Sequence, residues 1–467
     1  MKSVEAASPV RRFFLGYAFG ASLFSIGLIW LPGALADFLR LSSVFSIGYV
    51  VIIIAYLALF PAFAAWLSGY IRVPLELRAL LVWPALWSLM EFLRAEAVVG
   101  GLPWLSLGVT QIDGPLAGWA PIGGEFGLSF ASVFCSGLIW LLQKALWNHS
   151  WRTLSSYLIV SVAFGLVSFQ LLDKQWTQLS NKTLKVALIQ SSFSQSERGN
   201  PVFRDKIISH FERHTKVHLG EADLIIWPET ATPLHAEQLH HQFSGLFGHA
   251  GRRDTAVLVG TLEHTVGGGE YNSAVLYGPS GRNSYRKRHL VPFGEVLPPL
   301  FSWLHRWWHN DLRLLPGMRV PVFRIGDMEV VPTICWEILF SRDVLRRVNL
   351  NPSVLVNIGN EGWTLSDAAR QRNLQVARLR AIETGRPLVR VMNAGYSAVI
   401  GPTGKTYRLV KPGQLNERIA VVRPSYGETP FVAAGPDLMA VLDVVLLMLS
   451  MVFFRVHRNV TRMHEVA

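Results

Sequence analysis

The sequence has few cysteines and few charged residues, and both shortages narrow the class of protein. Only Cys135 and Cys335 occur among the 467 residues, so a framework of disulfide bonds is excluded. Charged residues make up 16% of the chain, whereas apolar residues make up 50%. This balance is typical of a membrane protein. The sixteen tryptophans agree with it, because tryptophan gathers at membrane interfaces.

Other absences exclude further classes. The net charge is +12, but no dense basic run with interleaved aromatic residues occurs, so we expect no nucleic-acid partner. Among the 14 histidines no pair has the spacing of metal ligands, and His240 and His241 are adjacent. We therefore predict no metal and no cofactor. The first apolar segment lacks a small-residue cleavage site, which favours a retained helix over a signal peptide.

Long apolar segments predict a multi-span membrane domain. A helix of about 20 apolar residues crosses a bilayer core of ~30 Å, and longer ones tilt. Six segments fit this description at least approximately: 13–31, 44–70, 79–93, 122–142, 155–172 and 438–454. We predict a membrane domain of about five helices at 1–173. A catalytic domain follows at 174–434, and a transmembrane helix with a cytoplasmic tail at 435–467.

Lysines and arginines beside these segments predict the orientation. If every segment spans, most of them fall on one side: Arg11, Arg12, Arg72, Arg78, Lys144, Arg152, Arg455, Arg458 and Arg462. Arg40 and Arg94 are exceptions. Positive residues stay in the cytoplasm, so both termini are expected there. The block between the fifth and sixth spans is then expected on the outer face of a bacterial inner membrane.

The block between the fifth and sixth spans has an α/β pattern. Short apolar runs of strand type occur at 185–190, 222–227, 256–260, 271–277 and 353–358. Helical patterns at 203–218 and 368–384 separate some of these runs. Alternating strands and helices, with glycine and proline at the joins, predict a layered α/β domain.

Three reactive residues follow apolar runs within this block. Glu229 follows one run, Lys287 another and Cys335 a third, so they can meet at one edge of a sheet. A thiol is a useful nucleophile only as a thiolate, which requires a nearby base or cation. This Glu-Lys-Cys set indicates carbon–nitrogen or acyl-transfer chemistry. Cys135 lies within an apolar span without an expected charged partner, so we do not expect it to react.

These motifs resemble a known family. Residues 184 to about 424 resemble a nitrilase-type carbon–nitrogen hydrolase domain, through Trp227-Pro228-Glu229, 287–295, Ile334-Cys335-Trp336-Glu337 and 378–387. The run 289–295 and the membrane motifs resemble the apolipoprotein N-acyltransferase family. Those membrane motifs are Glu91-Phe92-Leu93-Arg94, Pro103-Trp104, 111–116 and 120–122. The resemblance implies a multi-span helical membrane domain joined to an α/β nitrilase-type αββα sandwich.

The resemblance also implies roles for individual residues. Cys335 would be the nucleophile that forms a thioester, Glu229 the general base and Lys287 the group that stabilises the oxyanion. Four further residues would bind substrate or support the site: Glu295, Glu337, Trp227 and Trp336. The implied partners are a phospholipid acyl donor and a lipoprotein acceptor, and we expect a monomer in the inner membrane with its catalytic domain facing the periplasm.

Two departures from the family pattern keep other functions open. The family usually begins with two additional spans, and its Asn-Asp-Ala-Trp-Phe-Gly segment is Asn360-Glu361-Gly362-Trp363-Thr364-Leu365 here. The nearby Trp-Gln-His is also replaced, around 371–373. A shortened relative, the nitrilase-like conjugal transfer protein TraB, fits these losses. The alternatives are therefore a membrane-tethered amidase that uses a small amide and water, linked to plasmid transfer, and a non-catalytic component of a transfer apparatus.

An aromatic segment follows Glu295. Residues 297–308 contain one phenylalanine and three tryptophans, and we expect this arm to dip into the membrane interface and admit an acyl chain to Cys335.

Overall fold

The computed structural model describes residues 7–39, 42–98, 100–265, 267–297, 314–414 and 417–466. The chain forms two compact units. The membrane unit comprises Met1–Pro32, Ser42–Trp176 and Thr429–Ala467, and the catalytic unit comprises Gly33–Leu41 and Thr177–Glu428. The segment Gly33–Leu41 thus packs with the catalytic unit, although it lies far from it in sequence. Most of the aromatic segment 297–308 lies outside the described residues, so its role stays a prediction.

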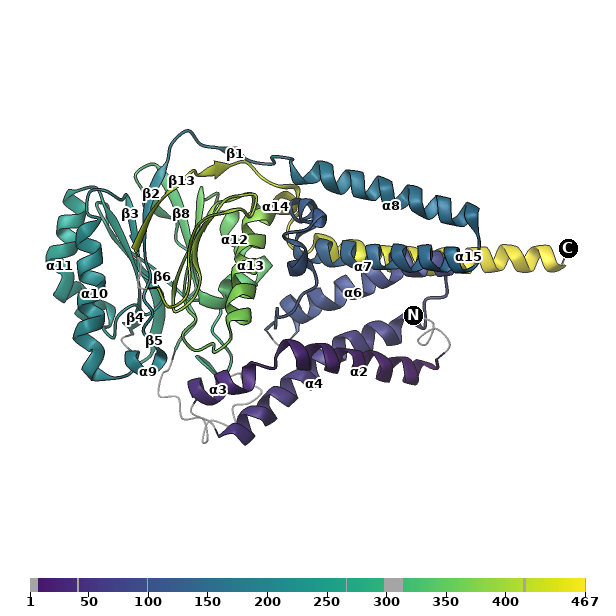
Figure 1. Cartoon of the computed structure of the whole chain (residues 1–467), viewed down its shortest axis with the longest axis horizontal. Coiled ribbons are helices and arrows are strands. Elements are labelled where there is room, and N and C mark those ends of the chain that lie inside the picture. The colour runs from purple at the N-terminus through teal and green to yellow at the C-terminus, as the bar shows by residue number, and fades with distance from the viewer. Residues whose placement is uncertain are drawn as a thin grey trace. The chain divides into compact units, whose positions relative to one another are not determined.

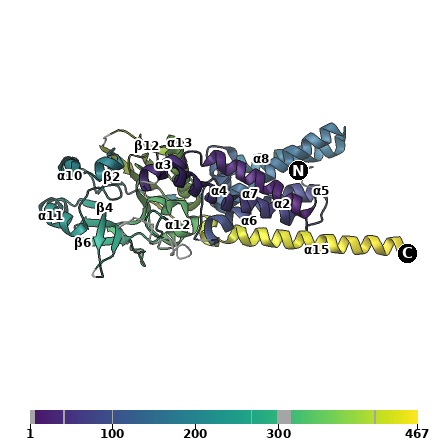
Figure 2. The same ribbon diagram turned by 90° about the horizontal axis from the view of Figure 1, so that it is seen from below.

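The membrane unit is helical throughout its described part (Figure 1). Its elements are α2 (Pro9–Gly27), α4 (Ser43–Ser68), α5 (Leu75–Leu77), η1 (Arg78–Val82), α6 (Trp83–Phe92), η2 (Leu93–Ala97), η3 (Gly108–Gln111), η4 (Pro115–Trp119), α7 (Ala120–Trp147), α8 (Trp151–Leu172), α14 (Pro430–Ala434) and α15 (Leu438–Val466). Helix α15 runs beside α6 (Figure 2).

Three stretches in the described part of the chain are long and apolar enough to cross a membrane: Ser43–Ser68, Pro115–Trp147 and Trp151–Leu172. A fourth is possible if the pair Pro9–Gly27 and Leu31–Asp37, bent by 53°, counts as one span. The first predicted span is therefore not one straight helix.

Two of the six predicted spans are not among these stretches. The segment predicted at 79–93 lies in a helix that begins with the π-helical turn η1, continues through α6 with Pro84 at its start, and ends in the π-helical turn η2. The apolar part of α15, Leu438–Val452, is shorter than a full span. A complete crossing by these two segments stays a prediction.

The catalytic unit contains two six-stranded sheets. The first has the order β13-β2-β3-β4-β5-β6 and the second has the order β12-β11-β10-β9-β8-β7. The first sheet consists of β2 (Leu184–Ile189), β3 (Leu224–Ile226), β4 (Ala256–His264), β5 (Glu270–Gly278), β6 (Gly281–Arg286) and β13 (Glu417–Val422). The second consists of β7 (Phe323–Ile325), β8 (Met328–Ile334), β9 (Val354–Asn360), β10 (Leu388–Asn393), β11 (Ser397–Ile400) and β12 (Thr406–Val410).

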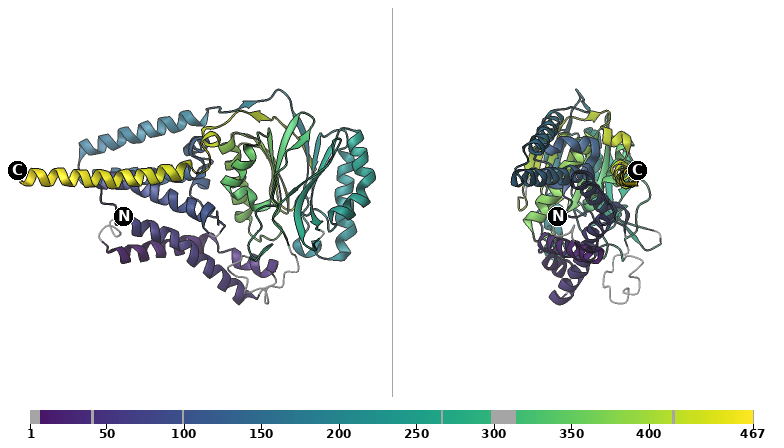
Figure 3. Two further views of the ribbon diagram at one scale, coloured as in Figure 1. Left: turned by 180° about the vertical axis from the view of Figure 1, so that it is seen from behind. Right: turned by 90° about the vertical axis from the view of Figure 1, so that its right-hand side faces the viewer.

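Helices cover the outer face of each sheet, which gives four layers (Figures 1 and 3). Beside the first sheet lie α10 (Arg204–Val217) and α11 (Ala236–Arg252), and beside the second lie α12 (Ser341–Val348) and α13 (Asp367–Thr384). Short elements complete the unit: α3 (Leu31–Leu39) from Gly33 onward, β1 (Gln178–Leu179), α9 (Gln195–Arg198), η5 (Pro201–Phe203), η7 (Cys335–Leu339) and β14 (Ser425–Tyr426). The predicted αββα sandwich is confirmed.

The alternation of side chains along β2 explains why both faces of its sheet are apolar. Val186 and Leu188 pack between the two sheets, whereas Ala187 and Ile189 pack beneath α10 and α11. Because successive residues of a strand point to opposite faces, a strand buried on both sides has a continuous apolar run. This is the pattern that revealed β2, β3 and β9 in the sequence.

The same parallel arrangement positions the polar residues. Strands β2, β3 and β4 are parallel in one sheet, and β8, β9 and β10 are parallel in the other. The residues that follow β3, β8 and β9 therefore leave the sheets at carboxyl ends. Strands β1 and β14 pair with each other where the chain enters and leaves this unit.

Candidate active site

Two turns beside the sheets carry Glu229 and Cys335 in an unusual backbone conformation. Cys335 directly follows β8 with a φ of +54°, and Thr230, directly after Glu229, has a φ of +42°. Non-glycine residues rarely occupy this left-handed region, and it costs roughly 1–3 kcal/mol each. Such strain concentrates at functional sites. Here it turns the chain sharply after each strand.

Two glycines leave room for these turns. A Cβ atom on Gly260 would lie 2.2 Å from the carbonyl oxygen of Pro228 and 2.6 Å from Cα of Glu229. A Cβ atom on Gly359 would lie 2.8 Å from Sδ of Met392 and 3.2 Å from Cα of Cys335. Only glycine lets β4 and β9 pass this close to the two turns.

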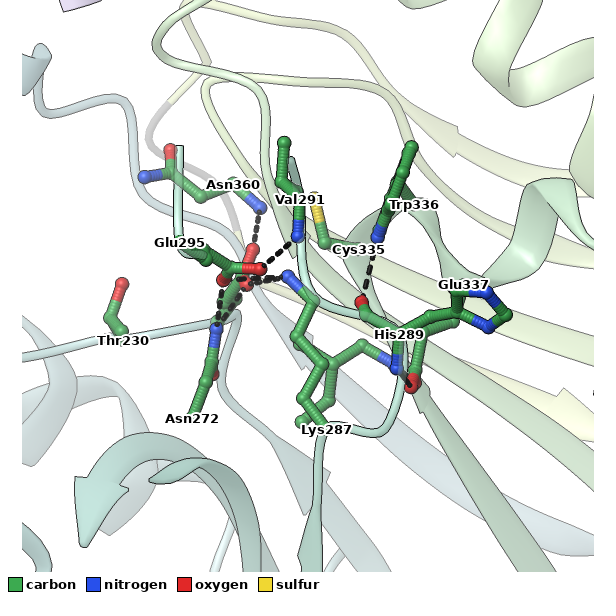
Figure 4. Close-up of polar contacts among 12 residues, drawn as sticks. Thr230, Asn272, Lys287, His289, Val291, Glu295, Cys335, Trp336, Glu337 and Asn360 are labelled. Atoms are coloured by element: carbon green, nitrogen blue, oxygen red, sulfur yellow. Dashed lines mark hydrogen bonds and ion pairs between the residues drawn. The ribbon is translucent and has the colours of Figure 1, made fainter. Parts of the chain in front are cut away.

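Lys287 forms one buried ionic cluster with Glu295, as Figure 4 shows, and with Glu229. Nζ of Lys287 lies 3.1 Å from Oε1 of Glu229 and 2.8 Å from Oε1 of Glu295. The lysine side chain is 1% exposed. Burial alone lowers the pKa of Lys287, but the two carboxylates outweigh it and raise the pKa well above its usual value. Lys287 is therefore a permanent cation in a dry site.

Hydrogen bonds hold both carboxylates in place. The Asn272 side chain donates to Oε1 of Glu229 at 2.7 Å and to Oε1 of Glu295 at 3.0 Å. The backbone N–H of Asn360 donates to Oε2 of Glu229 at 2.9 Å, and that of Val291 donates to Oε2 of Glu295 at 2.8 Å. Every oxygen of these two carboxylates therefore accepts a hydrogen bond.

The thiol of Cys335 is protonated at neutral pH. Burial raises its pKa most, and the negative charge of Glu229 raises it further, while Lys287 lowers it. The net effect is a pKa above the usual value. A nucleophile in this state requires a base to remove its proton at the moment of attack. Glu229 is the carboxylate with the strongest electrostatic effect on the thiol.

Glu337 joins the turn that carries Lys287 to the turn that carries Cys335. It is completely buried. Its carboxylate accepts hydrogen bonds from the backbone N–H groups of Arg288, His289 and Ile334 at 2.8, 3.1 and 2.8 Å. The Tyr285 hydroxyl donates at 2.7 Å, and Nη2 of the buried Arg347 lies 3.1 Å away. Glu337 is a positioning residue behind the site.

The two tryptophans lie in different places. Nε1 of Trp336 donates to the carbonyl oxygen of His289 at 2.7 Å, and the side chain is partly exposed beside Cys335. Trp227 is fully buried in the core between β3 and the helices, where its ring packs on Phe211 and Nε1 donates to Thr215 at 2.9 Å. Trp227 therefore supports the turn that carries Glu229 and lies away from the thiol.

Sequence patterns missed two contributors, Asn272 and the Tyr285–Arg347 pair. Asn272 lies inside β5, and asparagine is depleted in strands, so its presence in that run was an available signal. Tyr285 and Arg347 are 62 residues apart in the sequence and meet only through the fold. No local pattern could have paired them.

One possible set of metal ligands also escaped the sequence prediction. His235, His264 and Glu270 place one ligand atom each within 4.8 Å of one another. The two imidazole rings stack at 3.9 Å with an angle of 18° between them. Nearly parallel rings do not point their nitrogens at one ion in the tetrahedral arrangement that zinc prefers. The absence of a metal stays a prediction.

Family models match both parts of the chain. The apolipoprotein N-acyltransferase N-terminal domain matches residues 2–138, and the carbon–nitrogen hydrolase domain matches residues 185–426. The apolipoprotein N-acyltransferase of Nitrosomonas europaea is 30% identical over 97% of this chain and 91% of its own length. That of Methylococcus capsulatus is 31% identical, covering 92% and 85%.

Solved structures of similar proteins cover about half of this chain. A carbon–nitrogen hydrolase superfamily protein from Xanthomonas campestris is 19% identical over 52% of this chain and 91% of its own, with a TM-score of 0.39. An amidase from Nesterenkonia is 18% identical over 52% and 90%, with a TM-score of 0.40.

The αββα sandwich and the matched domain define a carbon–nitrogen hydrolase with an added membrane unit. Within that class, the chain belongs to the apolipoprotein N-acyltransferase family. Its apolar helices and its relatives make it a membrane protein. The amidase and non-catalytic alternatives, with their link to plasmid transfer, are not better supported by these relatives.

The raised pKa of Cys335 predicts a distinctive pH profile. In a Cys135→Ser background, alkylation of Cys335 by iodoacetamide should be slow at pH 7 and still rise above pH 9. Glu229→Gln should increase the alkylation rate at pH 8, because it removes a negative charge that raises the thiol pKa, while abolishing turnover. Rates from mass spectrometry test this. Slower alkylation of Glu229→Gln at every pH would contradict it.

Glu337→Gln should destabilise the catalytic unit. The change leaves five donors around a neutral amide and weakens charge-assisted hydrogen bonds, which costs about 1–3 kcal/mol of unfolding free energy. Thermal unfolding in detergent should show a lower Tm, and turnover should fall with it. The matched control is Glu329→Gln on β8, the strand that precedes η7 and Glu337, where the carboxylate is more exposed and its ion-pair distance to Arg324 is 3.6 Å. Equal Tm values for the two variants would refute the positioning role.

Proposed function

We propose that this protein transfers an acyl group from a phospholipid to the N-terminal amine of an apolipoprotein, through a thioester on Cys335. The proposal rests on two features that occur together in one chain. A buried Glu-Lys-Cys set lies in a carbon–nitrogen hydrolase unit, and a helical unit of the N-acyltransferase type is joined to it. An apolar donor requires a membrane, and a thioester requires the thiol.

The first half-reaction forms the thioester. Glu229 takes the proton of the Cys335 thiol as Sγ attacks the ester carbonyl carbon of the phospholipid. The carbonyl oxygen becomes an oxyanion, which the ammonium of Lys287 stabilises. When the intermediate collapses, the carbon–oxygen bond of the ester breaks. The departing lysophospholipid oxygen then takes the proton from Glu229.

The second half-reaction uses the same three residues, but the thiol of Cys335 is now the leaving group. The neutral amine attacks the thioester carbonyl, and Glu229 takes a proton from the amine nitrogen. Lys287 again stabilises the oxyanion. Collapse breaks the carbon–sulfur bond, and the sulfur recovers its proton from Glu229. Glu229 ends each cycle as a carboxylate.

A cation is suited to this task only if it stays charged and fixed. Lys287 meets both conditions, because the two carboxylates keep its pKa raised and determine where its Nζ lies. A stabiliser that acts on charge developing in the transition state raises kcat, whereas uniform binding does not. Glu295 and Glu337 support this geometry, Trp227 supports the turn that carries Glu229 from the core, and Trp336 lies beside Cys335.

The same proposal includes the location and partners. We place the protein in the bacterial inner membrane, with the catalytic unit on the periplasmic side, as a monomer without nucleic acid. The lysines and arginines beside the apolar segments support this orientation. Membrane-bound lipoproteins would be accessible from that side.

An acyl adduct on Cys335 is the expected result of incubating the purified protein with phospholipid. Mass spectrometry should find the mass of one acyl chain on the peptide that contains Cys335. Cys335→Ala should show no adduct and no turnover, and Cys135→Ser, the matched control, should behave like the wild type. Release of free fatty acid without transfer to an amine acceptor would favour the amidase. Turnover by Cys335→Ala would overturn the mechanism.

Reporter fusions test the orientation. Alkaline phosphatase, which is active only outside the cytoplasm, should be active when joined after Lys174. It should be inactive when joined after Arg152 or Arg462, because those cationic ends are expected in the cytoplasm. The reverse pattern would contradict both the orientation and the lipoprotein acceptor, and would leave a cytoplasm-facing amidase as the better account.

A further inference from the structure

A cavity of about 240 Å³ lies beside Glu229, within the catalytic unit. Thr230, the residue after Glu229, lines it, and so does Asn360, whose backbone N–H holds the Glu229 carboxylate. Arg198 and Gln195 also line it. The cavity therefore lies next to the turn that carries the proposed general base.

Arg198 is the cation of this cavity, and part of its guanidinium is free to bind a ligand. Its Nη2 donates to the hydroxyl of Thr230 at 2.8 Å and also to the Thr230 carbonyl oxygen. Its Nη1 is buried, yet it has no hydrogen-bond partner among the described residues. A buried donor without a partner costs about 1–3 kcal/mol, and an oxygen ligand in the cavity would remove that cost.

The residues that line the cavity include several hydrogen-bond donors and no acidic residue. None of the lining residues is Asp or Glu, and the amides of Gln195 and Asn360 and the hydroxyl of Thr230 can all donate. Burial lowers the pKa of Arg198 to about 10, with Glu229 acting in the opposite direction. The guanidinium is still charged at neutral pH. Arginine pairs well with phosphate, because its planar fork of donors matches two phosphate oxygens.

We propose that Arg198 and the cavity beside Glu229 bind the phosphate of the glycerophospholipid that donates the acyl chain. The inference rests on the proposed function and adds a specificity-determining residue to it. In a glycerophospholipid the phosphate lies only a few bonds from each acyl ester. A phosphate held in this cavity would bring the ester carbonyl to the side of Glu229 and Cys335. Arg198 would then select phospholipids over neutral lipids.

The kinetic test compares two acyl donors. With a phospholipid, Arg198→Gln should lower kcat/KM for thioester formation by roughly 10- to 100-fold, the usual loss for a hydrogen bond to a charged group. With an activated acyl ester that has no phosphate, the same variant should react like the wild type. Arg204→Gln is the matched control, because Arg204 is an exposed arginine nearby in the sequence. Arg198→Lys should recover part of the loss.

Three outcomes would overturn the proposal. Equal losses with both donors would make Arg198 a structural residue. An unchanged kcat/KM with phospholipid would remove it from donor binding. A loss confined to the second half-reaction, measured from preformed acyl-enzyme, would assign it to an anionic group of the acceptor.

A binding measurement separates this proposal from the proposed function. Full-length Cys335→Ser in detergent cannot form the thioester, but it should bind a short-chain phosphatidylglycerol more tightly than the matching diacylglycerol. Adding Arg198→Gln should remove the difference, and adding Arg204→Gln should not. Equal affinities for the two lipids would refute the phosphate site, even if the wild type acylates Cys335. Failure of the wild type to form an adduct would instead refute the proposed function.

Discussion

The buried ammonium of Lys287 is the constraint on which the site depends. Taking an ammonium ion out of water costs several kcal/mol, and two carboxylates within 3.1 Å offset that cost. The lysine and both glutamates must therefore be treated as one unit, because removing either carboxylate leaves part of a buried charge unpaired. Asn272 donates a hydrogen bond to each carboxylate and so holds the two carboxylates at a fixed separation. The cluster also keeps the neighbouring thiol protonated until a substrate arrives, since the negative charge of Glu229 opposes formation of the thiolate.

A second layer fixes this cluster relative to Cys335. The turn that carries Cys335 and the turn that carries Lys287 follow strands of different sheets, and Glu337 accepts hydrogen bonds from the backbone of both turns. Arg347 and Tyr285 interact with the carboxylate of Glu337, which is fully buried. A left-handed φ at Cys335 is tolerated because these bonds hold the turn on both sides. The geometry of the site therefore follows from one buried carboxylate that no substrate needs to touch.

Part of the fold and of the candidate site could be predicted from the sequence, because the signals lie in short runs of consecutive residues. Strands β2, β3 and β9 are continuous apolar runs, and Glu229 and Cys335 come directly after such runs, so their meeting at a sheet edge could be inferred. Asn272, Tyr285 and Arg347 act through pairings across different strands and helices, which no local pattern contains. The cluster of His235, His264 and Glu270 could not be predicted for the same reason, because its members meet only in the fold. The segment at 79–93 was predicted as a span from its apolar content, and the backbone there is helical, but hydropathy does not register that this helix begins in the π-helical turn η1 and passes into η2 at Leu93.

Charge balance links the cavity to the chemistry. With the thiol neutral, Glu229 and Glu295 carry two negative charges and Lys287 one positive charge, so this cluster alone would repel an anionic lipid. Arg198 adds a second positive charge beside Glu229, so the two carboxylates and the two cations together are neutral, and the charge of Glu229 favours the charged form of the guanidinium. A donor phosphate at Arg198 would then lie against a cation rather than against uncompensated carboxylates. In the proposed mechanism, Arg198 therefore acts before the chemistry: it lets an anionic donor approach a cluster that would repel that donor without it.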